Sequence, residues 1–357
     1  MTASFILPAP DLLPAHWLLL EILEHLTFTI HILLVNLILG GSIILLWTRA
    51  FSRQYLPSTP AGVFTGKIPV LIAFAITFGV APLLFIQVTY GHLFYTSSLL
   101  MARWWILIVP LLLIAYYCAY GQSRAKSNTA SLILTLIMTG AFLYIAFIMS
   151  NNNTLMLRPA SWNKYFFDRH GTHLNLTDPA LFPRWLHFLA ASIAFGGLGA
   201  AVICRFRAKK GEMGSERRAA SALKIFAYAT LLQIVIGVCF LLALPANILQ
   251  DYLGGDLLQT VILALGALTG LTAVFLAFKN KVTLTACFAA LTVALMVCSR
   301  ALLRYAYLRE FFSYRQLQLK WQITPLILFL IVFIIGLFIL YYMLSTIWQI
   351  ENRRHSI

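Results

Sequence analysis

The chain has 357 residues, of which 61% are hydrophobic and only 10% are charged, whereas soluble globular proteins carry about 25% charged residues. This composition excludes an ordinary soluble enzyme. The apolar runs are long and continuous, which predicts transmembrane helices rather than the short alternating segments of a β-barrel. The formal net charge of +15 is explained by basic cytoplasmic loops rather than by nucleic-acid binding.

Nine apolar segments are long enough for a span, which needs about 20 residues. We expect an all-α polytopic membrane protein with one transmembrane helical-bundle domain over residues 1–357 and no internal repeat. The first segment has no Lys or Arg before it, unlike a cleaved signal peptide, so we expect it to stay. The predicted spans lie at about 17–47, 68–90, 101–120, 130–149, 184–204, 225–245, 257–278, 282–299 and 324–348.

The distribution of basic residues predicts the orientation. Most of the 26 Lys and Arg residues fall on the cytoplasmic side if the N-terminus lies outside and the C-terminus is cytoplasmic. The strongest cluster, "RFRAKKGEMGSERR", lies in a basic cytoplasmic loop at about 205–224. The largest outer loop, about 150–183, is polar and aromatic, and is either a docking surface or an ordinary connector.

The cysteines exclude one cofactor class. None of the five forms a CxxC or CxxCH motif, which excludes a c-type haem carried by this chain and argues against a disulfide framework. They lie in or beside apolar runs, where a free thiol packs as a small hydrophobe: Cys118, Cys204, Cys239, Cys287 and Cys298.

Two histidines lie inside predicted spans at matching depth. His31, in "LTFTIHILLVNLILGG", is about 24 Å of helix from Trp47, which places it just below the outer surface of a core about 30 Å thick. His187 follows the interface anchors Arg184 and Trp185 in the same leaflet. Because an ionisable residue in a span is a functional-site candidate and imidazole is a good axial ligand of haem iron, we predict His31 and His187 as haem ligands. The alternative is that a neighbouring carbonyl or carboxylate satisfies each ring.

Other polar residues near the outer surface are weaker candidates. Glu21 and His25 are i,i+4 neighbours and predict a carboxylate–imidazole pair. "HGTH", containing His170 and His173, is a weak metal-binding or haem-capping pattern.

Four segments in order carry a family resemblance. "LTFTIHILLVNLILGG" (26–41), "FAITFGVAPLLFIQVTYG" (74–91), "YIAFIMSNNNTLMLRPASW" (144–162) and "FPRWLHFLAASIAFGGLGAAV" (182–202) resemble subunit I of the cytochrome bd-type quinol oxidases. The resemblance implies a nine-span bundle with the N-terminus outside. It also implies that His31 ligates a high-spin haem and His187 the low-spin haem b.

The chain departs from this family at the positions that serve oxygen chemistry. The third-span acid corresponds to Arg103, the eighth-span acid falls near Arg304, and "LLQTVILALGALTGLT" (257–272) lacks the methionine that ligates the low-spin haem. The quinol-binding loop is reduced to about 246–256. Predicted spans two to nine contain no Asp or Glu, and arginine cannot hand protons on, so a carboxylate proton relay is missing.

The remaining candidates follow from these departures. Arg103, Arg300 and Arg304 could pair with haem propionates or extend to the interface. Gln87, Tyr90 and His92 could contact a quinone at one outer corner. Second axial ligands would have to come from residues outside the family pattern: His25, His92, His170, His173, Met101 or Met296.

The sequence thus predicts a haem b-containing electron-transfer subunit of a respiratory complex in a bacterial cytoplasmic membrane. Two or more haems b would relay electrons between the quinone pool or a haem chain and an extracytoplasmic c-type cytochrome with one or several haems, alongside other membrane subunits. Two alternatives remain open: a divergent bd-type oxidase subunit that reduces oxygen, and a haem-free scaffold or transporter.

Overall fold

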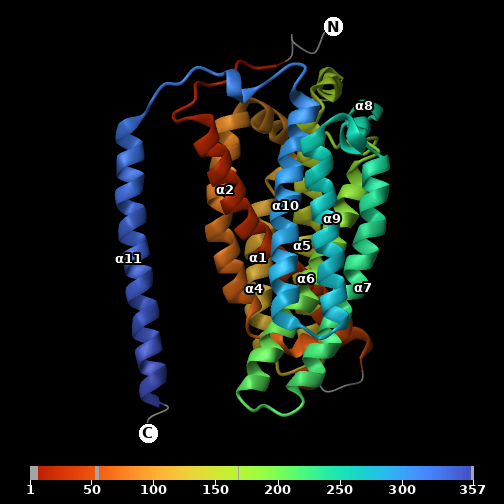
Figure 1. Ribbon diagram of the computed structural model, residues 1–357, viewed down its shortest axis with the longest axis vertical. Coiled ribbons are helices and arrows are strands. Elements are labelled where there is room, and N and C mark those ends of the chain that lie inside the picture. Colours follow the sequence, from red (N-terminus) through yellow and green to blue (C-terminus); the bar gives the residue numbers. More distant parts are fainter. Residues whose placement is uncertain (1–6, 53–55, 168, 355–357) are drawn as a thin grey trace.

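The chain folds into an α-helical bundle, which confirms the predicted fold class (Figure 1). The computed structural model describes residues 7–52, 56–167 and 169–354. Within these ranges there is no β-strand, and one isolated bridge joins Leu13 to Leu319. The elements are α1 (Trp17–Phe51), η2 (Leu56–Ser58), η3 (Pro60–Phe64), α2 (Ile68–Leu100), α3 (Ala102–Trp105), α4 (Ile108–Arg124), α5 (Asn128–Leu157), η4 (Pro159–Phe166), α6 (Leu181–Lys209), α7 (Ser215–Leu242), α8 (Ala246–Gln250), η5 (Asp251–Gly255), α9 (Leu257–Phe278), α10 (Val282–Leu308), η6 (Tyr314–Gln316) and α11 (Ile323–Arg354).

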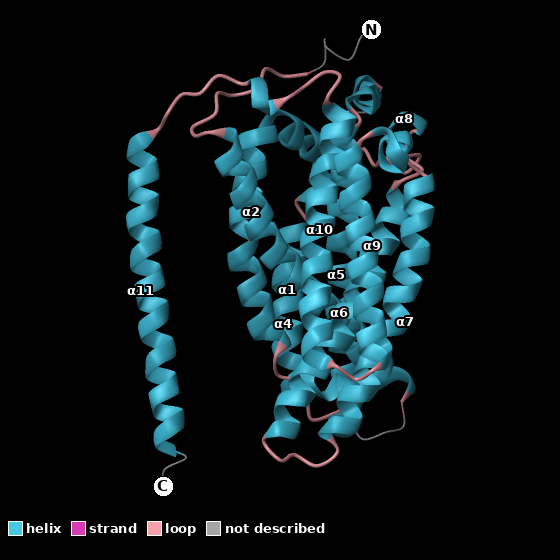
Figure 2. Ribbon diagram, viewed as in Figure 1, coloured by secondary structure: helices cyan, strands magenta, loops and turns pink. Residues whose placement is uncertain are grey.

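Eight helical segments of the described chain are long and apolar enough to cross a bilayer: α1, α2, α3 with α4, α5, α6, α7, α9 and α10. The ninth predicted span falls within α11. α1 begins and α11 ends at opposite ends of the molecule, and the loops gather at these two ends (Figure 2). In keeping with the predicted orientation, we call the end at which α1 begins the outer end.

Several helices run further than the apolar segments that predicted them. The predicted outer loop 150–183 is shorter, because α5 continues to Leu157 and α6 begins at Leu181. The helix continues through polar residues there because Asn151 receives a hydrogen bond from the main chain of Asn175. The predicted basic loop 205–224 is also mostly helical, and only residues 210–214 separate α6 from α7.

The centre of the bundle is a close contact between α1 and α6. A Cβ atom on Gly40 would lie 1.6 Å from the carbonyl oxygen of Ser192, and one on Gly196 would lie 2.5 Å from the carbonyl carbon of Gly40. One turn away, the Ser192 hydroxyl donates a 2.9 Å hydrogen bond to Asn36 Oδ1. Glycine at both positions therefore permits the two helix backbones to touch.

α11 stands apart from the other helices and is joined to them at the outer end (Figure 1). The connecting strand-like segment pairs with the N-terminal segment, since the amide of Lys320 donates to the carbonyl of Leu13 at 2.9 Å. Arg315 adds an ion pair with Glu21 at 3.4 Å. These contacts fix the start of α11 to the start of α1.

A prediction on pH dependence concerns the turn between α6 and α7. The hydrogen bond from Arg218 lowers the pKa of Glu212, and Arg207 lies 3.8 Å away on its other side. Because the folded-state pKa is lowered, this stabilisation is present above the unfolded pKa of about 4.3 and is lost as pH falls through the folded value. We expect Glu212→Gln to lower the melting temperature in detergent at pH 7 and to have no effect near pH 3. A difference that persists at the lower pH would contradict the assignment.

Candidate functional site

His31 and His187 occupy equivalent positions in two helices. Each is followed nine and ten residues later by a glycine pair: Gly40 and Gly41 after His31, and Gly196 and Gly197 after His187. The polar contact between α1 and α6 joins residues five positions after each histidine. The short pattern H-x8-G-G thus occurs twice in the sequence, and its two copies meet at the centre of the bundle.

The His31 ring lies between α1 and α2. Its Nδ1 donates a hydrogen bond to the carbonyl of Ala75 at 3.0 Å. One turn further along α2, a Cβ on Gly79 would lie 2.6 Å from Cε1 of the ring. The ring thus occupies space that any larger residue at position 79 would need.

The His187 ring lies in the same way between α6 and α7. Its Nδ1 donates to the carbonyl of Gln233 at 3.1 Å, and a Cβ on Gly237 would lie 3.1 Å from its Cε1. In both sites, therefore, the accepting carbonyl precedes the facing glycine by four residues. The Gln233 side-chain amide also donates to Nε2 of His187 at 3.2 Å.

These hydrogen bonds assign the same tautomer to both rings. A carbonyl oxygen can only accept, so each Nδ1 carries the proton and each Nε2 keeps a lone pair. Histidines that bind metals are held in this way, with the other ring N–H donated to a carbonyl or carboxylate. The alternative that a carbonyl satisfies each ring is correct for Nδ1. Nε2 of His187 already accepts from the Gln233 amide, which a ligand at that nitrogen would have to displace.

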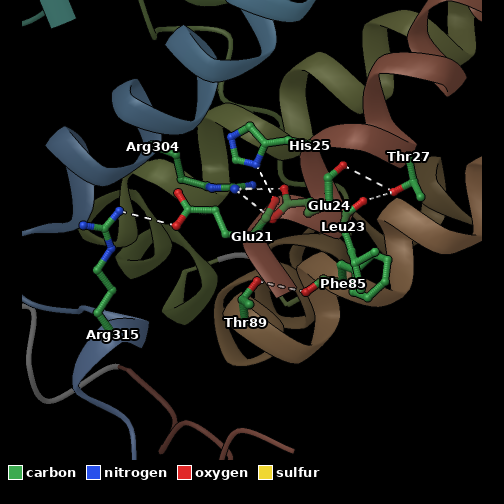
Figure 3. Close-up of polar contacts among 9 residues, drawn as sticks. All are labelled: Glu21, Leu23, Glu24, His25, Thr27, Phe85, Thr89, Arg304 and Arg315. Carbon is green, nitrogen blue, oxygen red and sulfur yellow. Dashed lines mark hydrogen bonds and ion pairs between the residues drawn. The ribbon is translucent and has the colours of Figure 1, made fainter. Parts of the chain in front are cut away.

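Three arginines lie near the outer ends of these sites. Arg304, on α10, has the most clearly defined polar contacts of the three. Its Nη2 donates to both carboxylate oxygens of Glu24 on α1, at 2.8 and 3.0 Å (Figure 3). The side chains are 5% and 7% exposed. Nε and Nη1 of Arg304 are buried with no hydrogen-bond partner among the described residues. Arg304 thus has a carboxylate partner that the sequence did not predict, and it still has free donors.

Arg300 and Arg184 lie closer to the two histidines. The guanidinium carbon of Arg300 is 4.5 Å from the ring centroid of Phe28, and that ring is 6.4 Å from the His31 ring. Arg184 precedes His187 by one turn, lies over Phe240 at 5.0 Å and has a buried Nε with no partner among the described residues. Arg184 is therefore more than the interface anchor expected from the sequence, and its position one turn before His187 is the signal in the sequence for this role.

Arg103 does not join this group. It is exposed on the short helix α3, so the structure favours the alternative that it extends to the interface.

The predicted Glu21–His25 side-chain pair is not formed. His25 Nδ1 donates to the main-chain carbonyl of Glu21 at 2.5 Å, while the Glu21 carboxylate reaches Arg315 (Figure 3). The reason is that an i,i+4 histidine can satisfy its N–H on the exposed helical carbonyl, and a cation on the connecting segment competes for the carboxylate.

Of the three residues expected at a quinone corner, Tyr90 is covered in the structure, whereas Gln87 and His92 are half-buried. Tyr90 is 3% exposed, lies beneath Arg304 and packs edge-on against Tyr314. The His92 ring packs against Phe312 at 4.4 Å. The segment after α10 therefore closes this corner, which contradicts an open quinone contact at Tyr90.

The other candidate ligands are engaged elsewhere. Met101 is fully buried and its sulfur accepts from Asn151 Nδ2 at 3.5 Å. Met296 packs against Gly266 of α9, where a Cβ would lie 2.0 Å from its methyl carbon.

The segment with His170 and His173 pairs with the α2–α3 junction, through main-chain hydrogen bonds from Arg103 to Gly171 and from His173 to Leu100, both at 3.0 Å. Across the described residues, no cluster of three or more His, Cys, Asp or Glu side chains could hold a metal ion.

Comparison with known proteins adds no assignment: no protein-family model matches the chain, and no curated protein matches it in sequence. The case for its function therefore depends on the residues described above.

Proposed function

We propose that this multi-pass membrane protein is a haem b-containing electron-transfer subunit of a respiratory complex. The observation that carries the proposal is the duplicated histidine site. His31 and His187 each direct an Nδ1–H to a neighbouring carbonyl and face a glycine, which leaves the unprotonated Nε2 as the ligand atom; at His187 the ligand would replace the Gln233 amide. One buried histidine of this kind is common, but two at equivalent places in a repeated helix pair are better explained by two similar ligands.

The surrounding residues fit a haem at each site. His31 and His187 would supply one ring nitrogen each to the iron, and glycines 79 and 237 allow the two imidazole rings to lie against α2 and α7. Buried N–H groups without partners lie one to two turns towards the outer end, on Arg184 and Arg304. Since a buried guanidinium with unmade hydrogen bonds is costly, these groups are suited to the propionate carboxylates. Haem iron would supply reversible one-electron transfer.

Electron transfer suits the site better than oxygen reduction. Among the described residues, Glu24 is the only carboxylate buried within a helix, and its two oxygens are held by Arg304. A carboxylate whose two oxygens are both held by a guanidinium has no free oxygen turned towards a haem or a water chain. Within the described ranges, the helices therefore offer no buried and unpaired acid that could deliver protons to bound oxygen.

The proposed partners follow from the depth of the sites. Both histidines lie nearer the outer end, so electrons would be exchanged with a c-type cytochrome on the extracytoplasmic side of a bacterial cytoplasmic membrane. The other redox partner would be the quinone pool or a haem chain in accompanying membrane subunits.

The test is a pyridine haemochrome assay on the purified protein. We expect b-type haem at about two per chain, one for each histidine site, and a reduced-minus-oxidised spectrum with the sharp α band of a haem b. A purified, folded protein without haem would refute the proposal and favour a haem-free scaffold or transporter.

A further inference from the structure

A cavity opens at the outer end of the bundle, beside η4 and α8. Its volume is about 470 Å³, within the range of ligand-binding clefts. Four segments line it: the start of η4, residues 175–178, residues 245–248 and the end of α10. We call it the outer pocket.

η4 forms one wall of the outer pocket and is held in place by contacts with two neighbouring segments. Trp162 is 1% exposed, and its indole N–H donates to the carbonyl of Leu155 at 2.9 Å. Arg158 pairs with Asp178 at 2.7 Å and lies over the ring of Tyr307 at 5.7 Å. η4 is thus fixed both to the end of α5 and to the opposite wall.

Three consecutive exposed aromatic residues stand at the end of η4: two are its last residues and the third follows it directly. Tyr165, Phe166 and Phe167 are 42%, 59% and 92% exposed. Large aromatic side chains on a fixed support are typical anchors of protein interfaces, and clustered exposed apolar groups mark interaction sites.

The position of η4 indicates a partner from the aqueous side. Figure 1 shows it beyond the outer ends of the long helices, beside α8, rather than on the flank of the bundle that meets lipid. The pocket beside it is lined by charges of both signs, among them Lys164 and Glu310, together with the amide of Asn247. Such a lining suits the polar rim of a protein interface and does not suit acyl chains.

The outer pocket lies near the start of the helix that carries His187. Asp178, in its wall, accepts from the main-chain amide of Ala180 at the start of α6. His187 is six residues into the chain from the start of α6 at Leu181, about 9 Å at the helical rise. A redox group held at the outer pocket would be a short distance from a cofactor at His187.

We infer that the outer pocket and the η4 aromatic residues form the docking surface for an extracytoplasmic electron-transfer protein that carries covalently attached haem. The partner would offer an apolar cleft for Phe166 and Phe167, with a rim of mixed charge facing Lys164 and Glu310. The redox character of the partner rests on the proposed function; the surface itself does not.

Site-specific photocross-linking in the native membrane tests this inference. A benzophenone amino acid replaces Phe167, and a matched control places it at Phe206, which is 63% exposed near the opposite end of α6. After illumination, we expect the Phe167 probe to give an adduct that stains for covalent haem in a denaturing gel, and the Phe206 probe to give none. An adduct with lipid alone, an adduct with a protein lacking covalent haem, or no adduct would overturn the inference.

Two further measurements separate docking from folding and from haem binding. With the probe at Phe166, the Lys164→Glu, Phe167→Ser double variant should reduce the yield of the haem-staining adduct by about fivefold or more, as expected for loss of an interface anchor worth at least 1 kcal/mol; an unchanged yield would contradict the surface. The dithionite-reduced spectrum of the same membranes reports b haem separately. A haem-staining adduct in membranes without b haem would support the docking surface and refute the proposed function. B haem without the adduct would support the proposed function and refute the docking surface.

Discussion

Replacing Glu24 by Ala is expected to lower the free energy of unfolding by about 3–5 kcal/mol, because it leaves the Arg304 guanidinium buried without a counter-charge. Both Nη2 hydrogen bonds of Arg304 end on this carboxylate, and its remaining nitrogens have no partner among the described residues. The measurement is unfolding of the purified protein in detergent, followed by tryptophan fluorescence against temperature and denaturant.

The matched control for this prediction is Glu21→Ala, one helical turn earlier on α1. Glu21 also pairs with an arginine, but Arg315 is 43% exposed and the N–O distance is 3.4 Å. Partly exposed pairs contribute about 0–1 kcal/mol, so the control should be nearly neutral. Adding Arg304→Met to Glu24→Ala should recover part of the loss, because it removes the unpaired charge. Equal effects at Glu21 and Glu24 would show that burial does not set the strength of this pair.

Replacing Gly40 by Ala is expected to have the second-largest effect, a loss of about 3 kcal/mol or more. The added methyl would lie 1.6 Å from the carbonyl oxygen of Ser192, which is backbone and cannot rotate away. α1 and α6 would have to separate, and the Asn36–Ser192 hydrogen bond beside them would lengthen. Overpacking of a close-packed site usually costs about 1–3 kcal/mol and sometimes more.

Gly140→Ala is the control for Gly40→Ala. Gly140 lies within α5, and a Cβ there would meet no atom within 4 Å. Alanine is favoured over glycine in a helix by about 1 kcal/mol, so this variant should be neutral or slightly more stable in the same unfolding assay. A Gly40→Ala protein as stable as Gly140→Ala would mean that α1 and α6 are not in contact at this point.

Much of the fold could be predicted because each helix is indicated by a continuous apolar run in its own sequence. Each predicted span corresponds to a helix, since apolar length alone determines whether a segment can cross a bilayer. The helix ends were less predictable: α5 extends through Asn151 because a partner from the following loop satisfies that side chain, and no local pattern encodes such a partner.

Of the candidate site, only the two histidines could be predicted from the sequence, and the residues that orient them could not. The depth of His31 and His187 in apolar segments was evident, but the carbonyls that orient them belong to residues 44 and 46 positions away. Glu24 and Arg304 are 280 residues apart, and nothing in either neighbourhood indicates the other. The two copies of the H-x8-G-G pattern share only a histidine and two glycines, while the residues between them differ.

Haem content after substitution of each histidine tests the central claim most directly. We expect His31→Ala and His187→Ala each to remove one of two haems b per chain in the pyridine haemochrome assay, and the double variant to remove both. His16→Ala, at the exposed start of α1, should keep the full content. If both single variants fold and bind as much haem as the unaltered protein, the two histidines are not haem ligands and the account is wrong.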